Sequence, residues 1–332
     1  MLFIEINKLI LFGGSRILSD FSYYLAANKN IDFCVFTSQR HLNELKSVFK
    51  KNNIRHYISG DINKDENLKK EITENSIGVA FGAAWVFNKH AVSLFKKDYL
   101  LDFMGIDLPR YRGGAHYTWQ TLHENKKGCA NLQIIYGGQE TFHKGEIIKR
   151  LEYSLPNKLK RPVDYFDFIA KSELNFLKDF LKEVNKGADF KLQRLNESKS
   201  SYYPFLSTEN NGYINWSWSG KDIYLFINAF DEPYSGATTY LNGKKVYLKD
   251  CALLKAEEKY HPFTVGLVIR KSKDGVFIAT AGNLLRVNKI FDSWGKNIIN
   301  LVELGERFVT PQIKLEGSLK FKANYGPGGL VK

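Results

Sequence analysis

Residue types that can do chemistry gather in one stretch, LDFMGIDLPRYRGGAHYTW, which spans positions 101–119. A carboxylate at Asp102 and an imidazole at His116 can move protons, and the guanidinium of Arg112 can hold anions or carbonyl oxygens. We expect Arg112 to act first as a structural donor to nearby carbonyls, with substrate or phosphate binding as the alternative. His116 follows two glycines in a loop, where a single histidine is usually exposed. The alternative is that it reaches the mouth of a pocket.

Other kinds of site find little support in the sequence. The turn Gly13-Gly14-Ser15 is not GxGxxG, which favours a close-packed strand-to-helix turn over a dinucleotide site. The cysteines lie far apart and show no CxxC or Cys/His ligand spacing, being Cys34, Cys129 and Cys251. We therefore expect no metal site and no disulfide framework.

The elements that must position these residues alternate between apolar runs and helical patterns. Short apolar runs at 8–14, 31–37 and 77–81 read as strands, and the charged stretch at 41–52 reads as a helix. Such alternation predicts an α/β domain with a parallel sheet and crossover helices. Ligands on such sheets bind beyond the carboxyl ends of the strands, which places the loop at 82–87 on the candidate face.

The second half of the chain changes character. A long amphipathic helix is expected at 163–184, and a polar segment follows it. Ser219 and Asp222 form a capping box for a short helix, and Asn242-Gly243 is a strong hairpin signal between alternating runs. We therefore predict a domain at 1–190, a linker at 191–204, a smaller β-rich domain at 205–320 and a tail at 321–332.

Two stretches resemble the formyltransferase family, which moves a formyl group from 10-formyltetrahydrofolate to an amine. The turn at 108–113 is similar to the family's signature loop. The region from Ile214-Asn215-Trp216 through the hairpin at 240–246 is similar to the carboxyl-terminal domain of methionyl-tRNA formyltransferases and some amino-sugar formyltransferases. The resemblance implies a Rossmann-like domain followed by an OB-like domain. It also implies folate binding by Gly82, Ala83, Ala84, Trp85, Leu108, Pro109 and Gly145.

The reactive centre departs from the family pattern. Alignment on the signature loop puts Asp102 where the family has Asn and Met104 where it has His, and His143 falls at the family's Asp. Losing one oxyanion donor typically costs about 3–4 kcal/mol, so ordinary formyl transfer should be impaired. One alternative is an exchanged pair, in which Asp102 orients His143 as donor or proton acceptor. The other is a catalytically silent binding homologue. Solvent exposure is the simpler reading of the flanking Glu140 and Glu146.

The resemblance leaves the acceptor amine open. Transfer RNA formyltransferases carry a long basic loop after the second strand, whereas here Thr37 leads almost directly into the helix at 41–52. The shorter connection is similar to that of amino-sugar formyltransferases, which favours a nucleotide-linked amine and disfavours tRNA. We expect a monomer or homodimer.

Composition sets the broad class. The chain has 332 residues, 44% of them hydrophobic, and a net charge of +13 from 48 Lys and Arg against 35 Asp and Glu. That excess favours anionic partners, although scattered lysines on a solvated surface are the simpler reading. The amino terminus lacks the features of a signal peptide, and no apolar run is long enough to span a bilayer. We therefore expect a cytoplasmic protein with no membrane contact.

Overall fold

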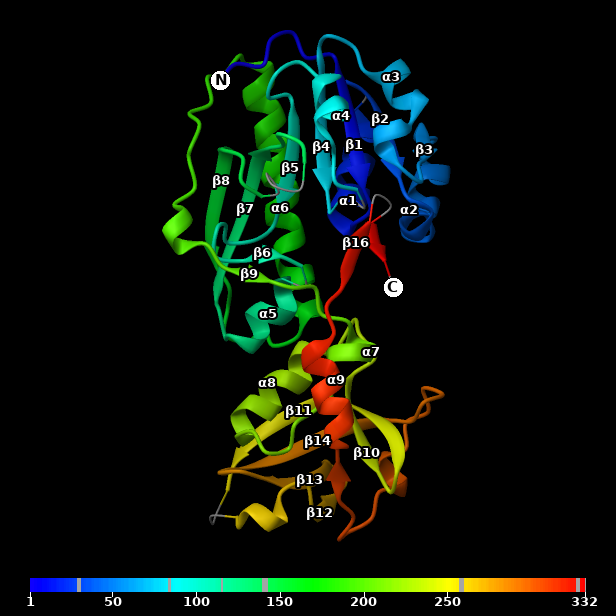
Figure 1. Cartoon of the computed structure of the whole chain (residues 1–332), viewed down its shortest axis with the longest axis vertical. Helices are drawn as coiled ribbons and strands as arrows, with labels where there is room; N and C mark the ends of the chain where they lie inside the picture. Colours follow the sequence, from blue (N-terminus) through cyan, green and yellow to red (C-terminus); the bar gives the residue numbers. More distant parts are fainter. Residues whose placement is uncertain are drawn as a thin grey trace.

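The computed structural model describes residues 1–28, 31–82, 85–114, 116–138, 143–256, 260–326 and 329–331. The chain forms an upper and a lower body in Figure 1, each with its own hydrophobic core. The larger core belongs to the amino-terminal α/β part and the other to the carboxyl-terminal β part. This arrangement is the α/β domain followed by a β-rich domain that the sequence predicts.

A seven-stranded sheet forms the amino-terminal domain, in the order β3-β2-β1-β4-β5-β7-β8. The first five strands in this order are parallel, whereas β7 and β8 run antiparallel to their neighbours and were not predicted from the sequence. The bounds are β1 (Lys8–Gly13), β2 (Asp32–Thr37), β3 (His56–Ile58), β4 (Ser76–Phe81), β5 (Leu100–Met104), β7 (Lys127–Ile134) and β8 (Ile147–Ser154). The carboxyl ends of β1 and β4 point toward the second domain (Figure 1).

Short glycine turns and capped helices connect these strands. An ideal Cβ on Gly14 would lie 2.1 Å from His41, which confirms the close-packed turn that the sequence favours after β1. The helices of this domain are α1 (Arg16–Asn28), α2 (Gln39–Lys51), α3 (Glu66–Glu71), α4 (Lys89–Ser93), α5 (His116–Leu122) and α6 (Pro162–Asn185). Because α2 begins two residues after β2 ends, the short connection expected there is also confirmed.

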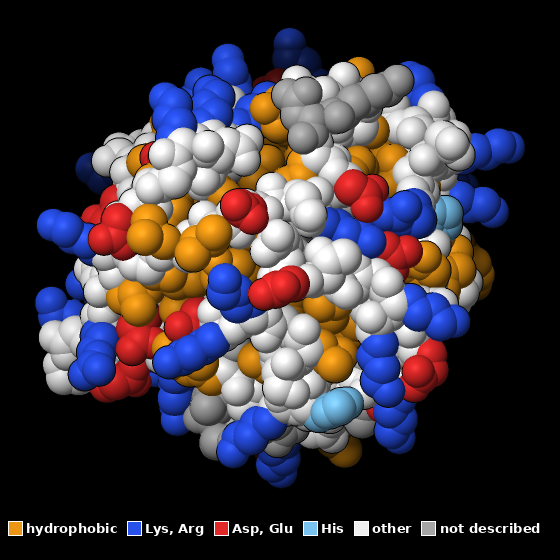
Figure 2. Space-filling model, turned by 90° about the horizontal axis from the view of Figure 1, so that it is seen from above, with side chains coloured by type: hydrophobic (Ala, Val, Ile, Leu, Met, Phe, Trp, Pro, Cys, Tyr) orange, Lys and Arg blue, Asp and Glu red, His pale blue; other side chains and the backbone are white. Residues whose placement is uncertain are grey.

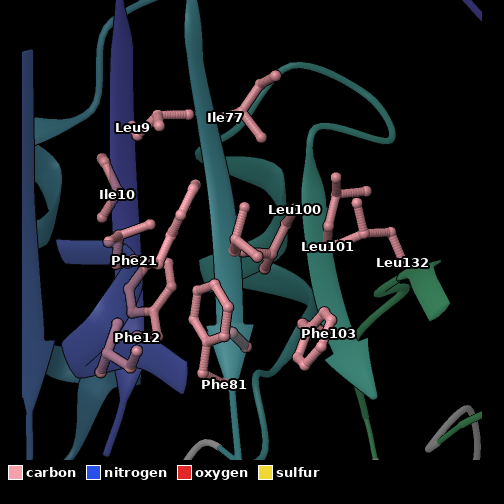
Figure 3. Close-up of a cluster of buried hydrophobic side chains, with 14 of the residues drawn as sticks. Leu9, Ile10, Phe12, Phe21, Ile77, Phe81, Leu100, Leu101, Phe103 and Leu132 are labelled. Carbon is pink, nitrogen blue, oxygen red and sulfur yellow. The ribbon is translucent and has the colours of Figure 1, made fainter. Parts of the chain in front are cut away.

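The apolar residues of β1, β4 and β5 form the centre of the core (Figure 3). Ile10 of β1 pairs with Gly78 of β4 and Phe12 with Ala80, and Phe21 of α1 packs 6.0 Å from Phe81 between ring centroids. Phe103 of β5 lies 5.6 Å from Phe81 in the same way. Burial on this scale holds the carboxyl ends of the strands, and the loops that follow them, in a fixed relation.

A curled six-stranded antiparallel sheet, β12-β13-β14-β11-β10-β15, forms the second domain. The predicted hairpin around Asn242-Gly243 is confirmed, and the Ser219 hydroxyl accepts the Asp222 backbone N–H at the start of α8 (Gly220–Ala229). The strands are β10 (Ala237–Leu241), β11 (Lys244–Lys255), β12 (Val268–Ser272), β13 (Gly275–Thr280), β14 (Asn283–Phe291) and β15 (Phe308–Val309). Helix α8 packs on β11 and contacts α5 of the first domain.

The segment between the domains lies along the first one. Its β9 (Tyr202–Tyr203) pairs with β6 (Arg112–Gly113), and a bridge joins Ile147 to Gln193. Beyond the sheet, α9 (Gln312–Lys320) packs on α7 (Thr208–Asn211). A small hairpin, β16 (Asn324–Gly326) with β17 (Gly329–Val331), then extends toward the first domain (Figure 1). The region predicted as a tail at 321–332 therefore contains a hairpin.

The surface carries the positive charge in scattered form. On the face in Figure 2, Lys and Arg side chains are spread around the rim and mixed with Asp and Glu. Among the described residues, the structure contains no helix with the length and apolar character needed to cross a membrane.

Candidate active site

A pocket of about 570 Å³ opens at the carboxyl ends of the parallel strands. Its lining comes from the turn after β1, the loop after β4, the end of β5, the loop before β8, and helices α5 and α6. A volume of this size suits a drug-sized ligand. These elements lie far apart in the sequence, and the strand order of the sheet brings them together around the pocket.

Asp102 and His143 meet in this pocket. The His143 Nε2 atom lies 3.7 Å from the Asp102 carboxylate, and the two side chains are 3% and 14% exposed respectively. Asp102 is on β5, where its neighbours in sequence are buried, and His143 lies in the loop before β8 with a φ of 56°. The two residues that the resemblance paired are therefore neighbours in space.

Burial favours the neutral form of both members of this pair. Desolvation raises the pKa of Asp102 to about 7. Desolvation, together with the nearby His116 and Arg112, lowers the pKa of His143 to about 3. At neutral pH His143 is therefore uncharged, and Asp102 holds a proton in a large fraction of molecules. The carboxylate and imidazolium expected for an ordinary ion pair are not the favoured states.

Met104 occupies the pocket wall at the position where the family has a histidine. It is buried and packs with Ile106, Leu108 and Ile147. Asn131 donates a hydrogen bond from Nδ2 to the Met104 carbonyl over 3.1 Å, which fixes the end of β5. The thioether contributes apolar surface and no hydrogen-bond donor.

The signature loop holds the site together from behind. Leu108 and Pro109 are buried and do not line the pocket, so the expected role of these two residues in cofactor binding finds no support in this geometry. Gly145 is also outside the lining, and an ideal Cβ there would lie 1.8 Å from the Ile134 carbonyl. The loop that carries His143 can therefore lie against β7 only with glycine at this position.

Arg112 acts as a structural hydrogen-bond donor, which is the role that we expect first from the sequence. Its Nε donates to the His143 carbonyl over 3.0 Å, and its terminal nitrogens contact Glu197 and Ser200 at 2.6 to 2.7 Å. A guanidinium so engaged has little capacity left for a substrate, and the alternative substrate-binding role is not supported. Its effect is to fix the His143 loop and the linker to each other.

His116 differs from the expectation of an exposed loop residue. It begins α5, lines the pocket and is half-buried, with its Nε2 2.7 Å from the Gly113 carbonyl. Desolvation lowers its pKa to about 4. The imidazole is therefore neutral, and its position in the pocket wall agrees with the alternative that the sequence left open.

The loop after β4 supplies the flat apolar side of the pocket. Gly82 has a φ of 56°, and an ideal Cβ on it would meet nothing within 4 Å. Trp85 lines the pocket, is buried, and has an Nε1–H with no hydrogen-bond partner among the described residues. The candidates Ala83, Ala84 and Glu140 lie outside the described residues. Glu146 is partly buried and ion-pairs with Arg194, which differs from the expected solvent exposure.

Two pocket residues were missed by sequence reasoning. Glu173 on α6 and Tyr117 on α5 both line the cavity. Desolvation raises the pKa of Glu173 to about 8, and hydrogen bonding from Tyr117 partly opposes this rise. A signal was present, because Glu173 lies four residues after Ile169 and four before Leu177, on the apolar stripe of α6.

The sequence is similar to that of known formyltransferases. Residues 207–307 match the model of the formyl transferase C-terminal domain. Methionyl-tRNA formyltransferase of Acetivibrio thermocellus is 26% identical over 56% of this chain and 57% of its own length. That of Desulfotalea psychrophila is 26% identical over 55% of this chain and 54% of its own length. The chain thus matches little more than half the length of these curated relatives.

Solved structures share the fold. An N-formyltransferase from Helicobacter canadensis, in complex with folinic acid and dTDP-3-aminofucose, superposes with a TM-score of 0.60 at 17% identity, over 85% of this chain and 99% of that one. The sugar 3N-formyl transferase WlaRD gives 0.59 at 18% identity, over 85% and 97%. HypX from Aquifex aeolicus with tetrahydrofolic acid gives 0.59 at 16% identity, over 88% of this chain and 45% of its own. At these identities the likeness concerns the fold alone.

Proposed function

We propose that the chain is a formyltransferase that transfers a formyl or related one-carbon acyl group from a reduced folate to an amine, which its similarity to formyltransferases supports. The acceptor is an amino-sugar nucleotide or a similar amine. The observation that carries this proposal is the approach of Asp102 to His143, 3.7 Å apart within a cavity of about 570 Å³. A silent binding homologue would keep the pocket, but it would have no need for two facing acid–base groups inside it.

The pair can perform the proton chemistry of acyl transfer in a new arrangement. Attack by an amine requires a hydrogen-bond donor for the developing oxyanion and an acceptor for the amine proton. A protonated Asp102 can donate its O–H, as the family's asparagine amide does. Neutral His143 can accept the proton at Nε2, and its low pKa keeps it available well below pH 6. Asp102 and His143 would thereby share the roles of the family's Asn, His and Asp.

The pocket also suits a reduced folate. Gly82 leaves open space where a Cβ would stand, and the surfaces of Trp85 and Phe87 offer a flat apolar wall. The backbone of Gly137 and Gly138 lines the same side. These groups would hold the heterocycle, and a bound 10-formyl folate would supply the electrophilic formyl carbon.

Two observations support this choice of acceptor. The short connection between β2 and α2 leaves no long basic loop to enter a tRNA acceptor stem. Two structural neighbours are sugar N-formyltransferases, and one was solved with dTDP-3-aminofucose. Similarity to methionyl-tRNA formyltransferases keeps tRNA as the second candidate acceptor. The buried thioether of Met104, which replaces a donor, favours the remaining alternative of a binding protein without activity.

One assay separates these readings. The native chain is incubated with 10-formyltetrahydrofolate and dTDP-3-aminofucose, and the formylated sugar is detected by mass spectrometry. The matched control is the triple variant Asp102→Asn, Met104→His, His143→Asp, which restores the family's residues in the same scaffold. We expect product from the native chain. Product from the triple variant alone would show that the native chain does not formylate this class of acceptor.

Folate binding is tested independently of turnover. Saturating 5-formyltetrahydrofolate should raise the melting temperature of the native chain, because a ligand that binds only the folded state stabilises it. The silent-homologue reading predicts the same shift without product. A well-folded sample whose melting temperature does not change at millimolar ligand would remove folate from the proposal.

A further inference from the structure

A second carboxyl group in the pocket has no part in the proposed chemistry so far. Glu173 is 6% exposed and lies near the middle of α6, on the same face as Ile169, Phe176 and Phe180. A carboxyl group on a buried helical stripe is costly unless a cation or hydrogen bonds compensate for the lost water. Among the described residues, no Lys, Arg or His nitrogen lies within 4 Å of it. Its surroundings leave its charge uncompensated.

The local packing holds this carboxyl group at the pocket wall. An ideal Cβ on Gly105 would lie 2.3 Å from Glu173 Oε1, so glycine at the end of β5 makes the room that the carboxyl group occupies. The Tyr117 hydroxyl of α5 lies 3.4 Å from the same Cβ position and holds the pKa of the carboxyl group below the value that burial alone would give, and Tyr153 lies close enough to influence it. The charged and titratable groups across the cavity are Arg16, Asp102, His116 and His143.

The other buried carboxylates show what a structural role looks like. Glu71 contacts Lys8 at 2.5 Å and Tyr57, and Arg55 lies 3.4 Å away. These partners lower its pKa, and it lies at the opposite, amino-terminal end of the sheet from the pocket. Glu173 has the burial of such a residue without the cations. A cation that it lacks within the chain can come from a ligand in the pocket.

We propose that Glu173 receives the acceptor as an ammonium ion and removes its first proton. This role rests on the proposed transfer to an amine. The N–H bond of the ammonium breaks and an O–H bond forms on Glu173, which leaves a neutral amine and a neutral carboxyl group. The amine then attacks the formyl carbon, His143 takes its second proton, and that proton passes to the departing folate nitrogen. The proton on Glu173 returns to water.

The proton affinities match this task. Burial raises the pKa of Glu173 to about 8 in the empty pocket, so its carboxylate is a stronger base than an exposed one and can take a proton from an ammonium group. Asp102 and His143 do not serve here, because one is assigned to the oxyanion and the other to the second proton. The ligand class is therefore a primary amine that is cationic in water.

A small probe tests the site without knowledge of the natural acceptor. Methylammonium chloride is titrated into the native chain by calorimetry at about pH 8.5, where Glu173 is largely ionised. Tetramethylammonium chloride, which has no N–H donor, is the matched ligand control. We expect methylammonium to bind the native chain and to bind Glu173→Gln at least about ten-fold more weakly. Glu183→Gln, on the same helix but outside the pocket lining, should behave as native.

The outcomes distinguish this inference from the proposed function. Equal methylammonium affinity in native and Glu173→Gln chains, or no binding to either, overturns the role of Glu173. Methylammonium binding that Glu173→Gln loses supports that role even where the formyl assay yields no product. Tyr117→Phe offers a second variant, since it leaves the carboxyl group in place and should weaken binding by a smaller factor. Should Glu173→Gln fail to fold, Tyr117→Phe binding as tightly as native counts against the inference.

Discussion

Asp102 and Asp107 lie five positions apart, and the fold gives their carboxyl groups opposite pKa shifts. Asp107 accepts contacts from Arg110 at 2.7 Å and Arg150 at 2.6 Å, and Lys127 lies 3.8 Å away. These cations and hydrogen bonds lower its pKa despite its burial. Among the residues that the structure describes, the only ion-pair partner of Asp102 is His143, which is neutral, and the pKa of Asp102 rises to about 7 because of burial.

The presence or absence of internal cations separates acids that stabilise the fold, such as Asp107, from acids of the pocket, such as Asp102. Asp107 also lies within reach of Cys129 and Glu152 in a geometry that could hold a metal ion, but its own cations already neutralise it. A buried acid with internal cations stabilises a structure and has no capacity left for a ligand. Asp102 and Glu173 keep that capacity, and the fold bears the cost of desolvating them. The predictions below test this contrast, beginning with the largest effect.

The scaffold acid should be essential for stability. Asp107→Asn leaves Arg110 and Arg150 beside a neutral amide, and breaking a buried pair in this way typically costs about 3–5 kcal/mol of unfolding free energy. Urea unfolding at pH 7 measures it. Asp102→Asn, the same chemical change in the pocket, is the control and should cost little. Equal losses in the two variants would remove the distinction between scaffold and site.

The pocket pair should be essential for turnover. Asp102→Ala or His143→Ala should each lower kcat at least about 100-fold in the formyl assay, and the double variant should cost little more than either single change. Groups that act as one unit are not additive. Independent, multiplicative losses would mean that the two residues do not work together.

Stability should depend on pH through the pocket acids. The folded pKa of Asp102 is raised from 3.8 to about 7, so its contribution is fully present below pH 3.8 and is lost as the pH rises through 7. Between pH 5 and pH 8 the native chain should therefore lose about 3 kcal/mol relative to Asp102→Asn. Unfolding at the two pH values measures the difference. His143, whose folded pKa is depressed, destabilises the fold only as the pH falls below 6.5.

The smallest effect concerns the linker. Limited proteolysis should cut first between Lys186 and Ser201, where the segment is mostly exposed. Glu197→Ala removes a half-exposed contact to Arg112, which should cost less than about 1 kcal/mol yet speed cleavage there. Peptide mapping of the early fragments is the measurement. Cleavage that begins inside either domain would contradict the domain boundaries.

Local patterns in the sequence were enough for much of the fold. The strands β1, β2 and β4, the helix α6, the capping box at Ser219 and the hairpin at Asn242-Gly243 follow from apolar period and turn chemistry. The antiparallel strands β7 and β8 were not predicted, because pairing direction depends on partners far along the chain. The family resemblance depended on short motifs, which survive even where the reactive residues have changed.

The character of the site was decided by tertiary packing. Asp102, His143 and Glu173 were visible as residue types, but a carboxylate on a strand or helix reads the same whether it faces water or a cavity. The packing of α5 and α6 removes water from Glu173, and the pairing of β5 with β7 carries the loop of His143 to within 3.7 Å of the Asp102 carboxylate. Desolvation is a property of surrounding elements, so proton affinity cannot be read from local sequence. The sequence by itself determined the scaffold and its motifs, whereas the tertiary structure set the charge states that the proposed chemistry requires.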